Sequence, residues 1–232
     1  GKLLKCNASF LSAGEPLTHD ARHRTTMEQA FQEFRPFLMT HLKTEMRQRF
    51  PQSHRVDFAQ FRRLWQRKFG NDANARRNFG PDVSWHIIRT YIKGMSAGSY
   101  QDPDDYRQFD AKERLVTDEV FDEVFKKVWE NWYQITCETN GYWDDQDLAR
   151  LLIDKNLIKA DYPAVFCDEA QDFTRLELEL ILRLCLFSGR AIAPQQISCI
   201  PLVFAGDPFQ TLNPTGFRWE ATKAAFVEKF VL

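Results

Sequence analysis

Acidic residues follow two short apolar runs in the C-terminal part of the chain. Residues 164–167 are followed directly by Asp168 and Glu169, and residues 201–205 are followed after one glycine by Asp207. If the two runs form neighbouring parallel strands, their carboxyl ends meet at one edge of a sheet, within ~5–10 Å of each other. Carboxylates placed in this way can hold Mg²⁺ and activate a water molecule beside it.

A structural interpretation competes with this chemical one. Aspartate begins helices well, so an acid directly after a strand can be a helix cap. Capping explains one such acid, but it does not explain two strands that end alike, with Gln171 and Gln210 shortly beyond them. The pattern therefore favours a magnesium–nucleotide site at the strand ends.

The segment between the two runs has the pattern of a helix. Residues 175–189 read RLELELILRLCLFSG, which is a helix-like run that stops at a glycine. A strand, a helix and a second strand, with both strands apolar throughout, predict a parallel βαβ unit that is buried on both faces. The crossover is expected to be right-handed.

Residues before about 160 show mainly the spacing of amphipathic helices. The expected helices are 25–50, opened by a capping-box pattern, 58–69, closed by Gly70, a third from Pro81, a fourth over 120–132 and a fifth over 144–154. Residues 96–106 are the clearest predicted loop. We therefore expect an α/β fold, with a mainly helical subdomain over 1–155 and a parallel sheet within 156–232.

Composition narrows the class of protein. No apolar run approaches the ~20 residues that a membrane span needs, so no membrane partner is expected. The five cysteines form no CxxC pair, which argues against a disulfide framework or a zinc site and indicates a cytoplasmic protein. Residues 1–100 hold 17 Lys and Arg against 8 Asp and Glu, whereas residues 101–232 hold 14 against 24. The basic first part is a weak indication of a polyanionic partner.

Two stretches carry a family resemblance. VFCDEAQDF, residues 165–173, resembles motif II of superfamily 1 helicases of the UvrD/Rep type, in which hydrophobic residues precede D-E-x-Q-D. VFAGDPFQTLNPTGFRW, residues 203–219, resembles motif III, in which G-D-x-x-Q precedes an aromatic–Arg pair. YWDDQDLARLL (142–152) and HRVDFAQFRRLW (54–65) resemble the segments that lead into motif II and into the inserted helical subdomain.

The resemblance implies a partial RecA-like (P-loop NTPase) sheet and a role for each matching residue. Asp168 would bind Mg²⁺, Glu169 would be the general base, and Gln210 would sense the γ-phosphate of ATP. The remaining residues implied to belong to the nucleotide site are Gln171, Asp172 and Asp207.

The second motif also implies contacts with single-stranded nucleic acid. Phe217 would stack on a base, with Arg218 and Trp219 beside it; stacking of this kind contributes ~1–3 kcal/mol and tolerates any base. The residues NPTG make this segment longer than the usual form, so the register of Phe217 against Trp219 stays open. Core packing is the alternative role for Phe217.

A basic stretch offers another nucleic-acid contact. The cations of this stretch, Arg62, Arg63, Arg67, Lys68, Arg76 and Arg77, are interleaved with Phe61, Trp65 and Phe69. One interpretation is a helix with an aromatic core face and a solvated charged face. The other is a phosphate-tracking surface on the inserted subdomain, and the two are compatible.

The phosphate loop G-x-x-x-x-G-K-[ST] does not occur in these 232 residues. The resemblance therefore implies a fragment of an ATP-dependent superfamily 1 helicase or translocase, inactive alone. In the intact protein, its partners would be Mg²⁺–ATP, single-stranded or duplex DNA (RNA being the alternative) and the remaining helicase domains of the same chain. The alternative function is a helicase-fold nucleic-acid-binding or regulatory module without turnover.

Overall fold

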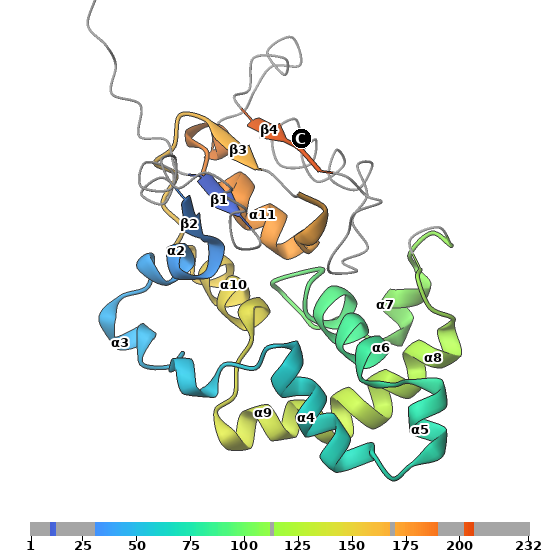
Figure 1. The fold of residues 1–232 in the computed structure, drawn as a ribbon. Helices are drawn as coiled ribbons and strands as arrows, with labels where there is room; N and C mark the ends of the chain where they lie inside the picture. Colours follow the sequence, from blue (N-terminus) through green and yellow to red (C-terminus); the bar gives the residue numbers. More distant parts are fainter. Residues whose placement is uncertain (1–9, 13–30, 112–113, 168–169, 190–201, 207–232) are drawn as a thin grey trace, which may run out of the picture.

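The computed structural model describes residues 10–12, 31–111, 114–167, 170–189 and 202–206. These residues form a small parallel sheet with helices packed against it, which we call the sheet unit, and a separate all-helical part, the helical insertion (Figure 1). The helical insertion comprises residues 56–142, and its hydrophobic core is distinct from the core of the sheet unit. No helix in the described part of the chain is both long enough and apolar enough to cross a membrane.

Four short strands make up the described sheet, in the order β2-β1-β3-β4. They are β1 Phe10–Ser12, β2 Phe31–Glu33, β3 Val165–Cys167 and β4 Leu202–Phe204. All three pairs of neighbours are parallel. Helix α11 (Arg175–Arg183) lies between β3 and β4 in sequence, so the predicted parallel βαβ unit is confirmed.

The two faces of β3 and β4 differ in burial. Val165 and Cys167 are buried, whereas Phe166 between them is 56% exposed. Val203, which pairs with Phe166, is 48% exposed. The prediction that both strands are buried on both faces is therefore wrong for the described part of the chain.

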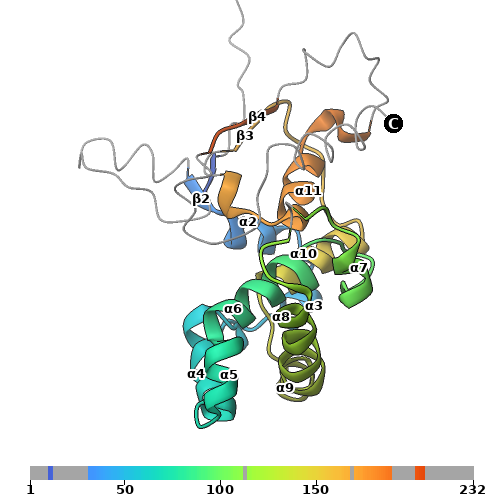
Figure 2. The ribbon, with the colours of Figure 1, turned by 90° about the vertical axis from the view of Figure 1, so that its right-hand side faces the viewer.

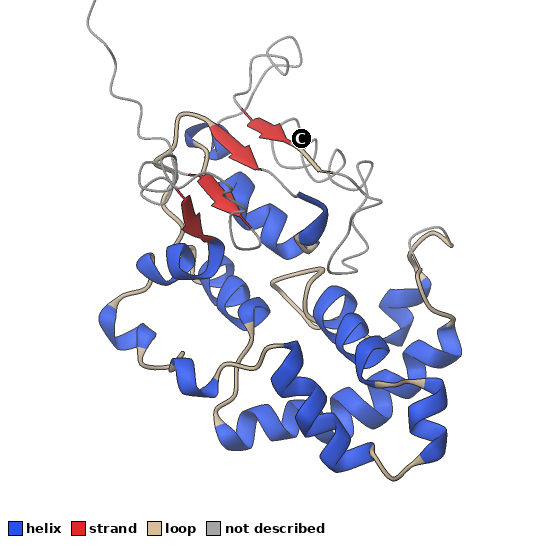
Figure 3. Ribbon diagram, viewed as in Figure 1, coloured by secondary structure: helices blue, strands red, loops and turns tan. Residues whose placement is uncertain are grey.

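Four α-helices accompany the sheet: α2 Phe34–Thr40, α3 Thr44–Arg47, α10 Asp145–Asp154 and α11 (Figure 3). Leu38, Leu148, Leu152 and Leu180 belong to their shared core. Three 3₁₀ turns complete the unit, at Gln52–His54, Ala170–Asp172 and Leu186–Gly189.

The prediction of a continuous helix over 25–50 is wrong. Residues 31–33 are strand β2, paired in parallel with β1, and the chain turns between α2 and α3. The pairing partner of β2 lies about twenty residues earlier in the sequence, and tertiary pairing overrides a local helical spacing.

The helical insertion begins with α4 Phe58–Phe69, which matches its predicted range. Its further helices are α5 Ala73–Asn78, α6 Pro81–His86, α7 Pro103–Arg107, α8 Asp118–Glu123 and α9 Gln134–Asn140. Two π-helices continue α6 and α8, namely η2 Ile87–Ile92 and η3 Val124–Tyr133. The loop prediction over 96–106 is wrong at its end, because Asp102 forms a capping box that begins α7.

The sheet unit includes segments from both sides of the insertion. Strands β1 and β2 precede the insertion, and α10, which the sequence analysis assigned to the helical subdomain, packs in the core of the sheet unit. The division therefore differs from the expected boundary at residue 155: the chain leaves the sheet after β2, forms the insertion and returns through α10 to β3 (Figure 1).

Candidate functional site

The sequence predicts a nucleotide site at the carboxyl ends of β3 and β4, and the structure describes the last residues of both strands. Seven of the predicted site residues lie outside the described residues, namely Asp168, Glu169, Asp207, Gln210, Phe217, Arg218 and Trp219. Gln171 and Asp172 are described, together with the last residues of both strands.

The two strand ends meet at one edge of the sheet. Cys167 pairs with Phe204 across the parallel ladder. The amide of Ala205 donates to the carbonyl of Cys167 at 2.8 Å, and the amide of Ala170 donates to the carbonyl of Ala205 at 2.9 Å. Cys167 and Ala170, which flank Asp168 and Glu169 in sequence, are thus both hydrogen-bonded to Ala205. The described backbone therefore brings the carboxyl ends of β3 and β4 to the same edge of the sheet, and the acidic positions themselves lie outside the described residues.

Gln171 is buried at this edge of the sheet, beside Gly206. Its side chain has no exposed surface, and it belongs to the 3₁₀ turn Ala170–Asp172. A Cβ atom placed on Gly206 would lie 2.3 Å from Gln171 Oε1, which is closer than real Cβ contacts allow. Gly206 therefore leaves the space that the Gln171 side chain occupies. Asp172 is also buried.

Helix α11 begins directly after this turn and has a complete capping box. The Glu177 carboxylate accepts a hydrogen bond from the Thr174 amide at 2.7 Å, and Thr174 Oγ1 accepts one from the Glu177 amide at 3.3 Å. Thr174 Oγ1 also lies 2.9 Å from Gln146 Oε1 of α10. The capping box therefore fixes the position at which the turn Ala170–Asp172 gives way to α11.

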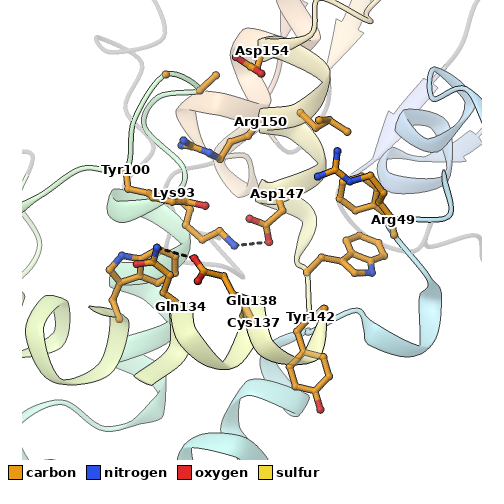
Figure 4. A pocket seen from close by; sticks show the side chains of 17 residues that line it. Arg49, Lys93, Tyr100, Gln134, Cys137, Glu138, Tyr142, Asp147, Arg150 and Asp154 are labelled. Atoms are coloured by element: carbon orange, nitrogen blue, oxygen red, sulfur yellow. Dashed lines mark hydrogen bonds and ion pairs between the residues drawn. The ribbon is translucent and has the colours of Figure 1, made fainter. Parts of the chain in front are cut away.

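A second candidate site is a cleft of about 610 Å³ between the helical insertion and α10 (Figure 4). Trp129, Tyr100 and Arg150 line it, and the Arg150 guanidinium lies 4.2 Å from the centre of the Tyr100 ring. The lining also includes the charged side chains Arg49, Lys93, Glu138, Asp147 and Asp154. Cationic and anionic side chains therefore line the cleft together.

Lys93 is the centre of an ionic cluster at the wall of this cleft. Its ammonium group is buried and lies 2.6 Å from both Asp144 Oδ2 and Asp147 Oδ2. Figure 4 shows it reaching from the insertion toward Asp147 of α10. Burial opposes the charge on Lys93, but the two carboxylates outweigh it and hold the pKa of Lys93 above its usual value.

Two carboxylates share one cation in this cluster, which affects Asp144 most. Burial first, and then the charge of Asp147, raise the pKa of Asp144 to about 6, against the opposing effect of Lys93. Asp144 is also the N-cap of α10, since its side chain accepts from the amides of Gln146 and Asp147. The cluster therefore fastens the insertion to the start of α10.

Sequence reasoning did not find this cluster. Lys93 is 51 residues from Asp144 in sequence, so no local pattern joins them. The available signal was one lysine at the end of the apolar run Tyr91–Ile92 and a surplus of acids at the start of α10. Among the described residues, no group of His, Cys, Asp and Glu could hold a metal ion.

The basic stretch lies on α4, and its two faces separate as predicted. Phe61 and Trp65 are buried in the core of the insertion, and Phe69 is half-buried. The four cations of α4, which we call the basic surface, are exposed: Arg62, Arg63, Arg67 and Lys68. None of the four forms an ion pair with another described residue.

Comparison with protein families and with curated protein sequences finds no match to this chain. The resemblance to superfamily 1 helicases therefore depends on the matching residues themselves, and the described backbone supplies their geometric context.

Proposed function

We propose that the chain is part of an ATP-dependent superfamily 1 helicase or translocase, which couples ATP hydrolysis to movement on single-stranded nucleic acid. The observation that carries the proposal is the joined edge of β3 and β4. There the residues flanking Asp168 and Glu169 are hydrogen-bonded to the end of β4, and Gln171 contacts Gly206. In parallel sheets, this edge is where nucleotides bind.

The acids at this edge fit a magnesium–nucleotide site by their chemistry. Mg²⁺ prefers carboxylate and water oxygens, and it would neutralise charge on the phosphates of ATP. Asp168 would hold the ion, and Glu169 would orient the attacking water and accept its proton as the bond to the γ-phosphorus forms and ADP leaves. Gln210 would contact the γ-phosphate. Gln171, buried beside Gly206, would contribute packing to this edge.

The proposal requires a phosphate loop outside these 232 residues. The pattern G-x-x-x-x-G-K-[ST] does not occur in these residues, and its amides and lysine hold the β- and γ-phosphates in P-loop enzymes. The proposal therefore assigns the activity to a longer protein that includes this chain, and that intact protein is the one to test.

Replacing the proposed base tests the assignment. Glu169→Gln keeps the shape of the side chain and removes its basicity, so ATP turnover should fall by ~10²–10⁴-fold while ATP affinity stays within a few-fold. Turnover and nucleotide binding should be measured side by side. The matched control is Glu130→Gln, an exposed residue of η3 that pairs with Lys126, and it should leave both values unchanged. Turnover within a few-fold of the parent in Glu169→Gln would remove Glu169 from the mechanism.

A nucleic-acid-binding module without turnover is the second candidate. The exposed basic surface of α4 favours it, because such a surface binds phosphates with or without hydrolysis. The two candidates differ in one measurable property, since only the motor hydrolyses ATP when nucleic acid is bound.

A further inference from the structure

The start of α11 is hydrogen-bonded to the helical insertion and closely follows the acidic edge, by which we mean the carboxyl ends of β3 and β4 with their predicted acids. Arg89 Nη2, on the π-helix η2, lies 3.2 and 3.1 Å from the two carboxylate oxygens of Glu177. The amide of Leu176 donates to the carbonyl of Gly94 at 2.8 Å. We call these contacts between residues 89–94 and 174–177 the α11 junction.

The junction is buried and closely packed. The side chain of Glu177 is 4% exposed and that of Arg89 is 19% exposed. A Cβ atom on Gly94 would lie 3.0 Å from Thr174 Cβ, so the backbone of the insertion touches the cap of α11. A buried ion pair with such packing holds its two elements in one relative position, because breaking it leaves an uncompensated charge.

On one side, the junction meets the proposed nucleotide site. Thr174 follows the turn Ala170–Asp172 after one residue, and this turn is hydrogen-bonded to the end of β4. A one-residue connection cannot absorb a displacement of the turn, so the cap of α11 moves with it.

On the other side, the junction meets the basic surface. The π-helix η2 continues α6, so residues 81–92 form one helical rod, and α4 packs against α6 with the Phe61 and Trp85 rings 5.0 Å apart. In Figure 2, α4 and α5 lie at the end of the insertion that is farthest from the sheet. A rotation of the rod at the junction would therefore displace the basic surface.

One donor of the junction is available to a second arrangement. Arg89 Nη1 is buried and has no hydrogen-bond partner among the described residues. Buried donors of this kind are rare and call for an explanation. A guanidinium that uses one terminal nitrogen here can use the other in a shifted position of α11.

We propose that Arg89 and Glu177 are positioning residues that couple the nucleotide state of the acidic edge to the nucleic-acid affinity of the helical insertion. The inference depends on the proposed function and adds the route between its two sites. Spatial continuity alone does not demonstrate coupling, so the test measures the coupling itself.

The experiment measures the affinity of the intact protein for an oligothymidylate, with and without a non-hydrolysable ATP analogue and Mg²⁺. The ratio of the two dissociation constants is the coupling factor. In Arg89→Gln and Glu177→Gln, we expect the factor to move at least five-fold toward 1, with nucleotide-free affinity within two-fold of the parent. The double variant should match the single variants, because both remove the same link.

The matched control is Glu179→Gln, on the same helix. Glu179 pairs with Arg183 within α11 and makes no contact across the junction, so its replacement should leave the coupling factor unchanged. If Glu177→Gln does not fold, Arg89→Lys serves instead. It keeps the charge but cannot reach both carboxylate oxygens in the same way, and its factor should be intermediate.

The outcomes separate the two proposals. A parent factor different from 1 that persists in the folded junction variants, or falls equally in Glu179→Gln, overturns the inference and leaves the proposed function standing. A parent factor of 1 in a protein that hydrolyses ATP when DNA is bound overturns the inference alone, whereas a parent protein that does not hydrolyse ATP overturns both.

Discussion

Gln171 and Gly206 form a matched pair at the edge where β3 and β4 end. The glutamine side chain is fully buried, and the glycine leaves the space that its Oε1 atom occupies. Sequence analysis singled out Gln171 by its position after the acids, but it assigned the residue to nucleotide binding. The structure adds that Gln171 packs against the chain just after β4. This contact explains in physical terms why residue 206 is a glycine.

Adding one methyl group at this position should destabilise the protein. In Gly206→Ala the new Cβ would overlap Gln171 Oε1 and press on the Ala170 and Gln171 amides, and overpacking of this kind costs ~1–3 kcal/mol. The control is Gly98→Ala, an exposed site where the nearest atom lies 3.8 Å away. Urea unfolding of both variants measures the difference. Equal midpoints for the two would show that the Gln171–Gly206 contact is not tight.

Asp144 should give the protein an unusual pH dependence. The pKa of Asp144 is raised from 3.8 to about 6, so the folded state binds the proton more tightly than the unfolded state. Its contribution to stability is then complete below about pH 4 and is lost as the pH rises through about 6. Raising the pH from 5 to 7 should lower the free energy of unfolding by ~1 kcal/mol relative to Asp144→Asn, which keeps a capping oxygen.

Urea unfolding of the parent and Asp144→Asn at both pH values measures this difference. Asp104→Asn, at an exposed cap-proximal position of α7, provides the control and should follow the parent at both pH values. A parent that gains stability over Asp144→Asn between pH 5 and pH 7 would reverse the sign and refute the account of the cluster.

At the scale of elements, the sequence predicted those helices whose ends and faces are set by residues close in sequence. Helix α4 matches its predicted range because its aromatic stripe and its cap agree: the Asp57 side chain accepts a hydrogen bond from the Gln60 amide. Caps of this type contribute ~1 kcal/mol. The short strand β2 was missed because its stabilising partner is a distant strand, which leaves no periodic trace in three residues.

Sequence spacing also could not predict which helical segments are π-helices. Val120, Val124 and Val128 recur at steps of four, which sequence analysis read as an α-helix. From Val124 the structure is a π-helix, in which Val124 and Val128 are both buried. The ion pairs Lys93–Asp144 and Arg89–Glu177 join residues 51 and 88 positions apart, so they could not be predicted from spacing.

The basic surface of α4 should carry a measurable share of nucleic-acid binding. Replacing Arg62, Arg63, Arg67 and Lys68 with alanine removes exposed charge and leaves the buried aromatic face intact. If these side chains bind phosphates, the slope of log K against log salt should shrink by ~0.7–0.9 for each phosphate that is no longer neutralised. Salt-titrated anisotropy with single-stranded DNA measures the slope.

A charge-reduced control separates local binding from net charge. Lys126, Lys155 and Lys159 are exposed, and each pairs with an acid close in sequence. Their triple alanine variant should keep the parental slope. An unchanged slope in the α4 variant would show that its four cations are exposed to solvent and do not bind phosphates.

At the scale of the whole molecule, the charge asymmetry of the sequence does not follow the two structural parts, because the helical insertion, residues 56–142, holds 13 Lys and Arg against 14 Asp and Glu. The first hundred residues carry the excess of Lys and Arg and include α4, whereas the remaining residues carry the acids of α10 and of the strand edge. The insertion meets the sheet unit at the Lys93 cluster and at the α11 junction. Under the proposed function, the phosphate chemistry of the strand edge and the nucleic-acid binding of α4 would occupy separate places, connected through these two contacts.

ATP hydrolysis by the intact protein, measured with and without single-stranded DNA, tests the central claim most directly. A motor hydrolyses nucleotide when it is bound to its track, so we predict that saturating DNA stimulates turnover at least several-fold and that Glu169→Gln abolishes the stimulated rate. Salt-sensitive DNA binding without hydrolysis above background, in either condition, would contradict the claim and identify a binding module instead.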